Sequence, residues 1–320
     1  MEVFYSSPWV PPEWIQAHGF TARGLWPGEA ASSTPVPAGV CAMARSSMEF
    51  FEAHPRDAVV MAGTCDQMRR AADELRQRRH QVFLFNIPAT SQSRTAREIY
   101  EEEIERLGHF LLGLGGAAPS PTALAEALEQ RDRARARLRE LHRGGPVFEE
   151  FQAMAKFHGN PAAAGSPSKD TPGDRIPVAL VGGPLCPIHW PLFQRLEEAG
   201  VRLVLNGAEN GERSLLPRLP AGNWRADPVS AMVDAYFDQI TDVFQRPNTR
   251  LYQWLEHELQ ARAVRGLVVW SRPACDLWRA EAASLREALD IPLLVLEAGE
   301  NPSELPRQWG RLQAFVEMLA

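Results

Sequence analysis

Four cysteines are the residues of this chain whose type best suits chemistry, and they lie far apart along it: Cys41, Cys65, Cys186 and Cys275. Thiolates serve as nucleophiles and as ligands of zinc and of iron–sulfur clusters. Zinc sites are usually built from closely spaced pairs such as Cys-x-x-Cys, and the sequence has no such pair. An iron–sulfur cluster can take its thiolates from distant parts of a fold, so the spacing leaves this chemistry open.

Two of the cysteines occur in stretches that resemble each other. Each stretch has a short apolar run, a turn, the dipeptide Cys-Asp, a helical pattern and a second apolar run; they span residues 58–87, with Cys65, and 266–296, with Cys275. Ligands of parallel sheets bind outside the carboxyl ends of the strands, where helices present unpaired N–H groups. We therefore expect both thiols at a ligand-binding edge, with a lowered pKa. The alternative is that each cysteine is a small buried apolar side chain.

The elements that must position these thiols alternate between strand and helix, which predicts parallel α/β sheets. The expected strands are 21–26, 58–62, 82–88, 176–181, 201–205, 266–270 and 291–296. The expected helices are 12–19, 41–53, 67–79, 95–112, 121–141, 147–157, 190–199, 227–244, 248–263, 276–289 and 302–319. All four cysteines fall at strand ends or helix starts, so two domains that face each other across a cleft would bring them together.

A length of 320 residues suggests two domains. We predict two Rossmann- or flavodoxin-like α/β domains with parallel sheets, joined by a helical segment. The first domain spans 1–118 and carries Cys41 and Cys65; the second spans 176–320 and carries Cys186 and Cys275. The segment 119–175 holds two helices and a linker over 158–174, which is rich in Gly, Pro, Ala and Ser.

Charge and hydropathy exclude several classes of function. The net charge is −6, which argues against a protein that grips a nucleic-acid backbone. No run is long and apolar enough to span a membrane, and Arg23 is the first basic side chain, so no basic leader is visible. We expect a cytoplasmic protein with reduced cysteines. Nearly all basic residues are arginine, which biased codon usage explains. A guanidinium would also suit anionic ligands such as CoA phosphates or carboxylates.

Several motifs, in order along nearly the whole chain, resemble one known family: the iron–sulfur subunits of 2-hydroxyacyl-CoA dehydratases and benzoyl-CoA reductases, a group that includes double-cubane cluster proteins. The matching segments are Pro12–Gly19, Ala22–Leu25, Cys41–Ser46, Thr64–Arg70, Gly182–Leu185 and Ala274–Asp276. The resemblance implies a [4Fe–4S] cluster in the cleft between the domains, bound by Cys41, Cys65 and Cys275.

The resemblance also implies partners. These are a second family subunit in a hetero- or homodimer, a separate ATP-hydrolysing activator that donates one low-potential electron, and an acyl-CoA substrate. The chain has no Gly-x-x-x-x-Gly-Lys-[Ser/Thr] loop of its own, which agrees with an outside donor. The implied reaction is the radical dehydration or reduction of an acyl-CoA thioester.

The chain departs from the family pattern at two places. Ser6 and Ser7 stand where some members have a further cysteine, and Cys186 is an extra cysteine. Cys186 is either a bystander or a fourth ligand, and a cluster closed by four thiolates would favour electron transfer because substrate would have no open iron. Three alternatives therefore stay open: a non-catalytic electron-transfer or partner subunit, a double-cubane reductase of small molecules, and an α/β protein without metal.

Other polar residues are weaker candidates for the site. Glu13, His18 and His189 are possible acids or bases, although a glutamate at a helix start usually interacts with the helix dipole. Arg45 and Arg69, with the neighbouring Arg70, are candidates for binding CoA phosphates or stabilising thiolates.

Overall fold

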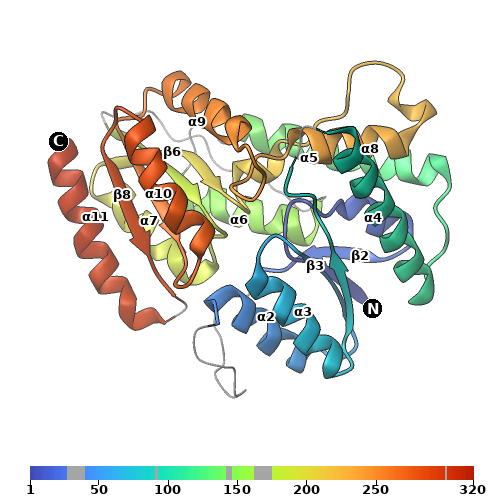
Figure 1. Cartoon of the computed structure of the whole chain (residues 1–320). Helices are drawn as coiled ribbons and strands as arrows, with labels where there is room; N and C mark the ends of the chain where they lie inside the picture. The colour runs from blue at the N-terminus through green and yellow to red at the C-terminus, as the bar shows by residue number, and fades with distance from the viewer. Residues whose placement is uncertain (27–39, 91–92, 142–145, 162–174, 300) are drawn as a thin grey trace.

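The computed structural model describes residues 1–26, 40–90, 93–141, 146–161, 175–299 and 301–320. Two parallel four-stranded sheets form two lobes, which confirms the predicted α/β class. Figure 1 shows β2 and β3 of the first sheet in one lobe and β6 and β8 of the second sheet in the other. Most of the predicted linker lies outside the described residues.

The first sheet has the order β2-β1-β3-β4. Its strands are β1 (Glu2–Tyr5), β2 (Thr21–Gly24), β3 (Ala58–Ala62) and β4 (Gln81–Phe85). The sequence analysis missed β1, which pairs with both β2 and β3. Its four residues directly precede a Ser-, Pro- and Trp-rich stretch, so the apolar run is too short to be recognised as a strand.

The second sheet repeats this topology in the order β6-β5-β7-β8. Its strands are β5 (Ile176–Gly182), β6 (Val201–Ala208), β7 (Gly266–Ser271) and β8 (Leu293–Glu297). In each sheet the third strand along the chain is an inner strand: Ala58–Ala62 in the first, Gly266–Ser271 in the second, and every residue of both is buried. The buried apolar runs are typical of parallel sheets covered on both faces.

Helices cover both faces of each sheet, because side chains alternate between the two faces along a strand. In the first lobe, Val59 and Met61 face α2 (Ala42–Ala53) and α3 (Asp66–Gln77), whereas Ala58 and Val60 face α4 (Arg94–Gly113). In the second lobe, one face contacts α7 (Trp190–Glu198) and α11 (Leu305–Leu319), and the other contacts α9 (Thr249–Ala261) and α10 (Asp276–Ala288). Each fully buried Leu, Val or Phe side chain contributes about 1.5–3 kcal/mol.

Three further helices are α1 (Pro12–Ala17), α5 (Pro121–Leu141) and α6 (Val147–Gly159). In Figure 1, α6 lies between the lobes, and it packs against both β2 and α7. His158 of α6 contacts both lobes, because Nδ1 is 3.1 Å from the Tyr5 hydroxyl and Nε2 is 3.1 Å from the carbonyl of Asn210. The helix therefore fixes the first lobe against the second.

One predicted helix is shorter than expected and packs on the other lobe. Asp227 caps α8 (Pro228–Gln239) as predicted, because its side chain accepts from the Ser230 N–H at 3.0 Å. The helix ends at Gln239 rather than at residue 244, since Ile240 is extended and Asp242 turns to pair with Arg213. Buried α8 residues join the core of the first lobe, so the chain returns to that lobe after β6. The domain boundaries drawn from the sequence stay predictions.

Candidate functional site

Three cysteines each stand immediately before a helix. Cys65 occupies the N-cap position of α3, Cys275 that of α10, and Cys41 that of α2. Cys65 and Cys275 follow β3 and β7 after turns of two and three residues, so both lie at the carboxyl ends of inner strands. The side chain of Gln67 accepts a hydrogen bond from the Cys41 N–H at 3.1 Å and thereby joins the start of α2 to the start of α3.

The three thiols line one cavity of about 680 Å³ between the lobes. The first lobe contributes Cys41 and Cys65 to its wall, and the second contributes Cys275. A cavity outside the carboxyl ends of parallel strands is where open α/β sheets bind their ligands. The folding therefore brings together three residues that are widely separated in the sequence. The other side chains on the wall include Arg70, Glu209, Asp242, Arg246, Arg272 and Trp278.

The thiols of Cys65 and Cys275 have raised pKa values, contrary to the expectation from their positions at helix starts. Burial, together with the nearby thiols of Cys41 and Cys65 and the carboxyl of Glu209, raises the pKa of Cys275 to about 11. Burial also raises the pKa of Cys65. The backbone N–H of Met68 lowers the pKa of Cys65, and that of Trp278 lowers the pKa of Cys275. These helix N-termini do not compensate for the removal of water from the two buried thiols. A metal deprotonates a bound thiol outright, so these pKa values describe thiols without a ligand.

The geometry of the cavity bears on which metal group it suits. Within the described parts of the chain, no three His, Cys, Asp and Glu side chains are placed to hold a single metal ion. In a [4Fe–4S] cluster, each cysteine binds a different iron, so the thiols surround the cluster instead of converging on one atom. Three thiols around one shared cavity fit this type of donor set.

Cys186 does not share that cavity. Its side chain is fully buried, and it is not among the described residues on the cavity wall. Arg272 donates a hydrogen bond from Nη2 to Cys186 Sγ at 2.8 Å, and Arg272 itself lines the cavity. The guanidinium therefore contacts the cavity on one side and holds the fourth cysteine on the other.

Two carboxylates of the second lobe complete the wall, and the sequence analysis missed both. Glu209 directly follows β6, and Asp242 lies beyond α8. Burial and the neighbouring charge of Asp242 raise the pKa of Glu209 to about 7, although Arg213 opposes the shift. Arg213 is 3.0 Å from Asp242 and is buried. A carboxyl group that titrates near neutrality is suited to transferring protons. The only signal in the sequence was the place of Glu209 at a strand end.

Comparison with known families decides the relationship. The profile of the family described as 2-hydroxyglutaryl-CoA dehydratase, D-component, matches residues 9–145 and 148–319. The chain belongs to this family. Comparison with curated proteins finds no match. The match covers nearly the whole chain and confirms the resemblance inferred from the motifs.

Three acid–base candidates lie away from the cavity of this D-component family member. Glu13 is fully buried, with Arg135 at 2.9 Å and the Tyr236 hydroxyl donating to it at 2.6 Å. His18 contacts the Trp14 carbonyl through Nδ1 at 2.8 Å, and burial lowers its pKa. His189 is 2.8 Å from the Gly299 carbonyl, and burial with the charge of Arg272 lowers its pKa to about 3. None of the three is among the described residues on the cavity wall, and their assignment as acids or bases stays a prediction.

The arginines at the cavity are not the two named first from the sequence. Arg45 is exposed on α2, and Arg69 donates to Asn86 at 3.3 Å; neither is on the cavity wall of the described residues. Arg70, Arg246 and Arg272 line it instead. The helical periodicity explains the change, because Arg70 lies one position further round α3 than Arg69.

The term D-component implies that members of this family work with a partner component. In the described part of the chain, no helix is both long and apolar enough to cross a bilayer.

Proposed function

We propose that this D-component family member is the iron–sulfur subunit of an enzyme that dehydrates or reduces an acyl-CoA thioester by one-electron chemistry. The observation that carries the proposal is the shared cavity of Cys41, Cys65 and Cys275. These three residues would hold a [4Fe–4S] cluster. When bound, the cluster would supply a low-potential electron and, at an iron without a thiolate, a Lewis acid.

The position of Cys186 favours substrate chemistry over electron transfer alone. A fourth thiolate on the cluster would leave no iron for a substrate oxygen. Because Arg272 holds the Cys186 sulfur outside the cavity, the protein offers three thiolates there. A cavity of about 680 Å³ also leaves room for part of a thioester beside the cluster.

The charged side chains of the cavity wall would have two roles, proton transfer and binding of the CoA phosphates. Glu209 would deliver a proton to the departing hydroxide, which leaves as water, because its carboxyl keeps a proton near neutral pH. Arg70, which is exposed, and Arg246, whose side chain is half exposed, stand at the wall with cationic groups that suit the phosphates of CoA.

The proposal is tested on protein that has been reconstituted anaerobically with iron and sulfide and reduced by one electron. We expect the electron paramagnetic resonance spectrum of the cluster to change when a 2-hydroxyacyl-CoA thioester is added. An electron-transfer subunit would keep its spectrum, and a double-cubane protein would contain more sulfide per dimer than two separate cubanes. A protein without iron after reconstitution would exclude all three.

A variant separates the proton donor from the cluster ligands. Glu209→Gln should keep the iron content and the spectral response to the thioester but lose at least about 100-fold in turnover, which is typical of a lost general acid. Because the amide cannot transfer the proton, binding should survive while the chemical step fails. An unchanged turnover would remove Glu209 from the mechanism.

A further inference from the structure

A second cavity, of about 600 Å³, lies at the outer edge of the second sheet, away from the thiols. Its wall comes from four separate elements: the end of α5, the edge strand β6, the segment that includes Glu212–Leu215, and α9. The side chains that carry charge there are Arg139, Arg202, Arg218, Arg262, Glu212, His257 and Glu258.

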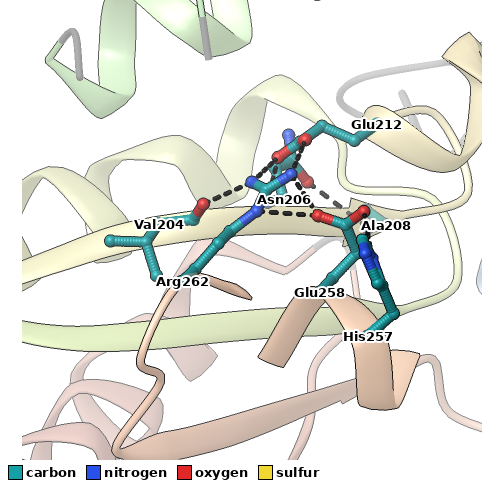
Figure 2. Close-up of polar contacts among 7 residues, drawn as sticks. All are labelled: Val204, Asn206, Ala208, Glu212, His257, Glu258 and Arg262. Carbon is teal, nitrogen blue, oxygen red and sulfur yellow. Dashed lines mark hydrogen bonds and ion pairs between the residues drawn. The ribbon is translucent and has the colours of Figure 1, made fainter. Parts of the chain in front are cut away.

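One of these arginines, Arg262, is bound by carboxylates and a backbone carbonyl of the protein itself. Figure 2 shows Arg262 between the carboxylates of Glu212 and Glu258, with Nη2 2.7 Å from each. Arg262 also donates to the Val204 carbonyl of β6, and Glu212 accepts from the Asn206 N–H at 3.0 Å. These contacts satisfy the free edge of β6, which would otherwise be open to another strand. The two carboxylates of the cavity are therefore committed to Arg262 and to the strand.

The rest of the wall has surplus positive charge. Arg139 donates to the backbone carbonyls of Leu215 and Pro217, which are neutral. Within the described residues, neither Arg139 nor Arg218 forms an ion pair. Burial lowers the pKa of Arg139 to about 10, and the charges of Arg218 and Arg135 lower it as well, although Asp132 opposes the shift. Arg202, which also interacts with another group of the protein, adds a third cationic side chain to the wall.

One aromatic side chain also lines the cavity. Trp254 of α9 is partly buried, and its ring packs close to Gly207, where an added Cβ would lie 3.1 Å from the indole. The cavity thus joins arginine guanidiniums, which pair with phosphate in a bidentate fork, to a flat apolar surface. Cavities of this size accept small organic molecules.

We propose that this cavity binds a phosphate group, with Arg139, Arg202 and Arg218 as the cationic partners. The phosphate comes either from a nucleotide, whose base would lie on Trp254, or from inorganic phosphate. The site is independent of the thiol cavity and of the proposed function, so either can fail alone.

Isothermal titration calorimetry of the full chain at low ionic strength tests the proposal with AMP, ribose 5-phosphate and inorganic phosphate as probes. We expect at least one probe to bind at a single site. Arg218→Gln and Arg202→Gln should each weaken binding by about tenfold, since each removes a charge-assisted contact. Arg311→Gln is the matched control, because Arg311 is an exposed residue of α11 with the same charge, and it should bind like the wild type.

Three results would overturn the proposal. The first is no binding of any probe, and the second is equal weakening by Arg311→Gln, which would indicate a general ionic effect. The third is that an acidic peptide binds and none of the three phosphate probes does, which would indicate that the cavity is a contact site for another protein.

Circular dichroism melting of each variant shows whether it is folded. Tighter binding of AMP than of ribose 5-phosphate would support the nucleotide, and equal binding of all three probes would support phosphate alone.

Discussion

The two Cys-Asp junctions invite comparison because the sheets behind them have one topology. In both lobes the third strand along the chain is an inner strand, and it leads to a cysteine at a helix start. The neighbours of these junctions differ. To the shared cavity wall the first lobe adds a second thiol, Cys41, whereas the second lobe adds the carboxyl groups of Glu209 and Asp242.

The difference shows how a repeated fold builds an asymmetric site. The matched positions supply one thiol from each lobe, and connections that do not match supply the third thiol and the carboxyl groups of Glu209 and Asp242. Cys41 follows the connection after β2, whereas Glu209 and Asp242 come from the long connection after β6 that includes α8. The result is a cavity to which the first lobe contributes two of the three thiols and the second lobe contributes Glu209 and Asp242.

The largest expected effect is on the iron content, and it distinguishes Cys186 from the three cavity cysteines. Cys41→Ser, Cys65→Ser or Cys275→Ser should abolish or sharply reduce the iron bound after anaerobic reconstitution, because each removes a cavity thiol. Cys186→Ser is the matched control, since its sulfur is held by Arg272. Iron and sulfide analysis with visible absorbance measures this. Loss of iron in Cys186→Ser equal to that in Cys275→Ser would make Cys186 a ligand and contradict the comparison.

The next effect concerns the buried ion pair that supports the first lobe. Arg135→Met should lower the free energy of unfolding by about 3–5 kcal/mol, because Glu13 would remain buried without its cation. Arg133→Met is the control on the same helix, since its partner Glu129 is at the surface, and it should change stability by less than about 1 kcal/mol. Urea unfolding measures both. Equal stabilities would mean that the Glu13 pair is dispensable.

Much of this arrangement was predictable from the sequence because it depends on local patterns. Buried strands followed by amphipathic helices gave β3, α3, β7 and α10, and the repeated Cys-Asp marked their junctions. What failed depends on contacts that are distant in the sequence. The orientation of Cys186 is set by Arg272, and the pKa of Glu209 by its burial near Asp242. The expectation that Cys65 and Cys275 have lowered pKa values was wrong, because a position at a helix start does not reveal that burial removes water from the thiol.

A smaller effect tests how closely the inner strands of the second lobe must approach. Gly182 ends β5, and an added Cβ there would lie 2.1 Å from the carbonyl oxygen of Trp270 on β7. Gly182→Ala should therefore lower the free energy of unfolding by about 3 kcal/mol. Gly183→Ala should cost less than about 1 kcal/mol, since its nearest neighbour, Trp278, would be at 3.8 Å. The first lobe has Tyr5 at the end of β1, so this constraint belongs to the second lobe. Thermal unfolding that ranks the two variants alike would contradict it.

The smallest effect is a dependence of stability on pH that two histidines share. Burial lowers the pKa of His158 and of His189 to about 3, with help from Arg131 and Arg272 respectively. The unfolded chain takes up protons at both near pH 6.5 and the folded chain does not, so their contribution is complete above pH 6.5 and is lost as the pH falls towards 3.

Each histidine should lower the free energy of unfolding by on the order of 2 kcal/mol between pH 6.5 and 5. His158→Gln and His189→Gln should each remove about half of this dependence, whatever their stability at pH 7. Urea unfolding at both pH values measures it. Because His158 contacts both lobes and His189 only the second, a larger change in the denaturant slope for His158→Gln would indicate that His158 couples the lobes. Slopes and pH dependence equal to those of the wild type would mean that neither histidine is held neutral by the fold.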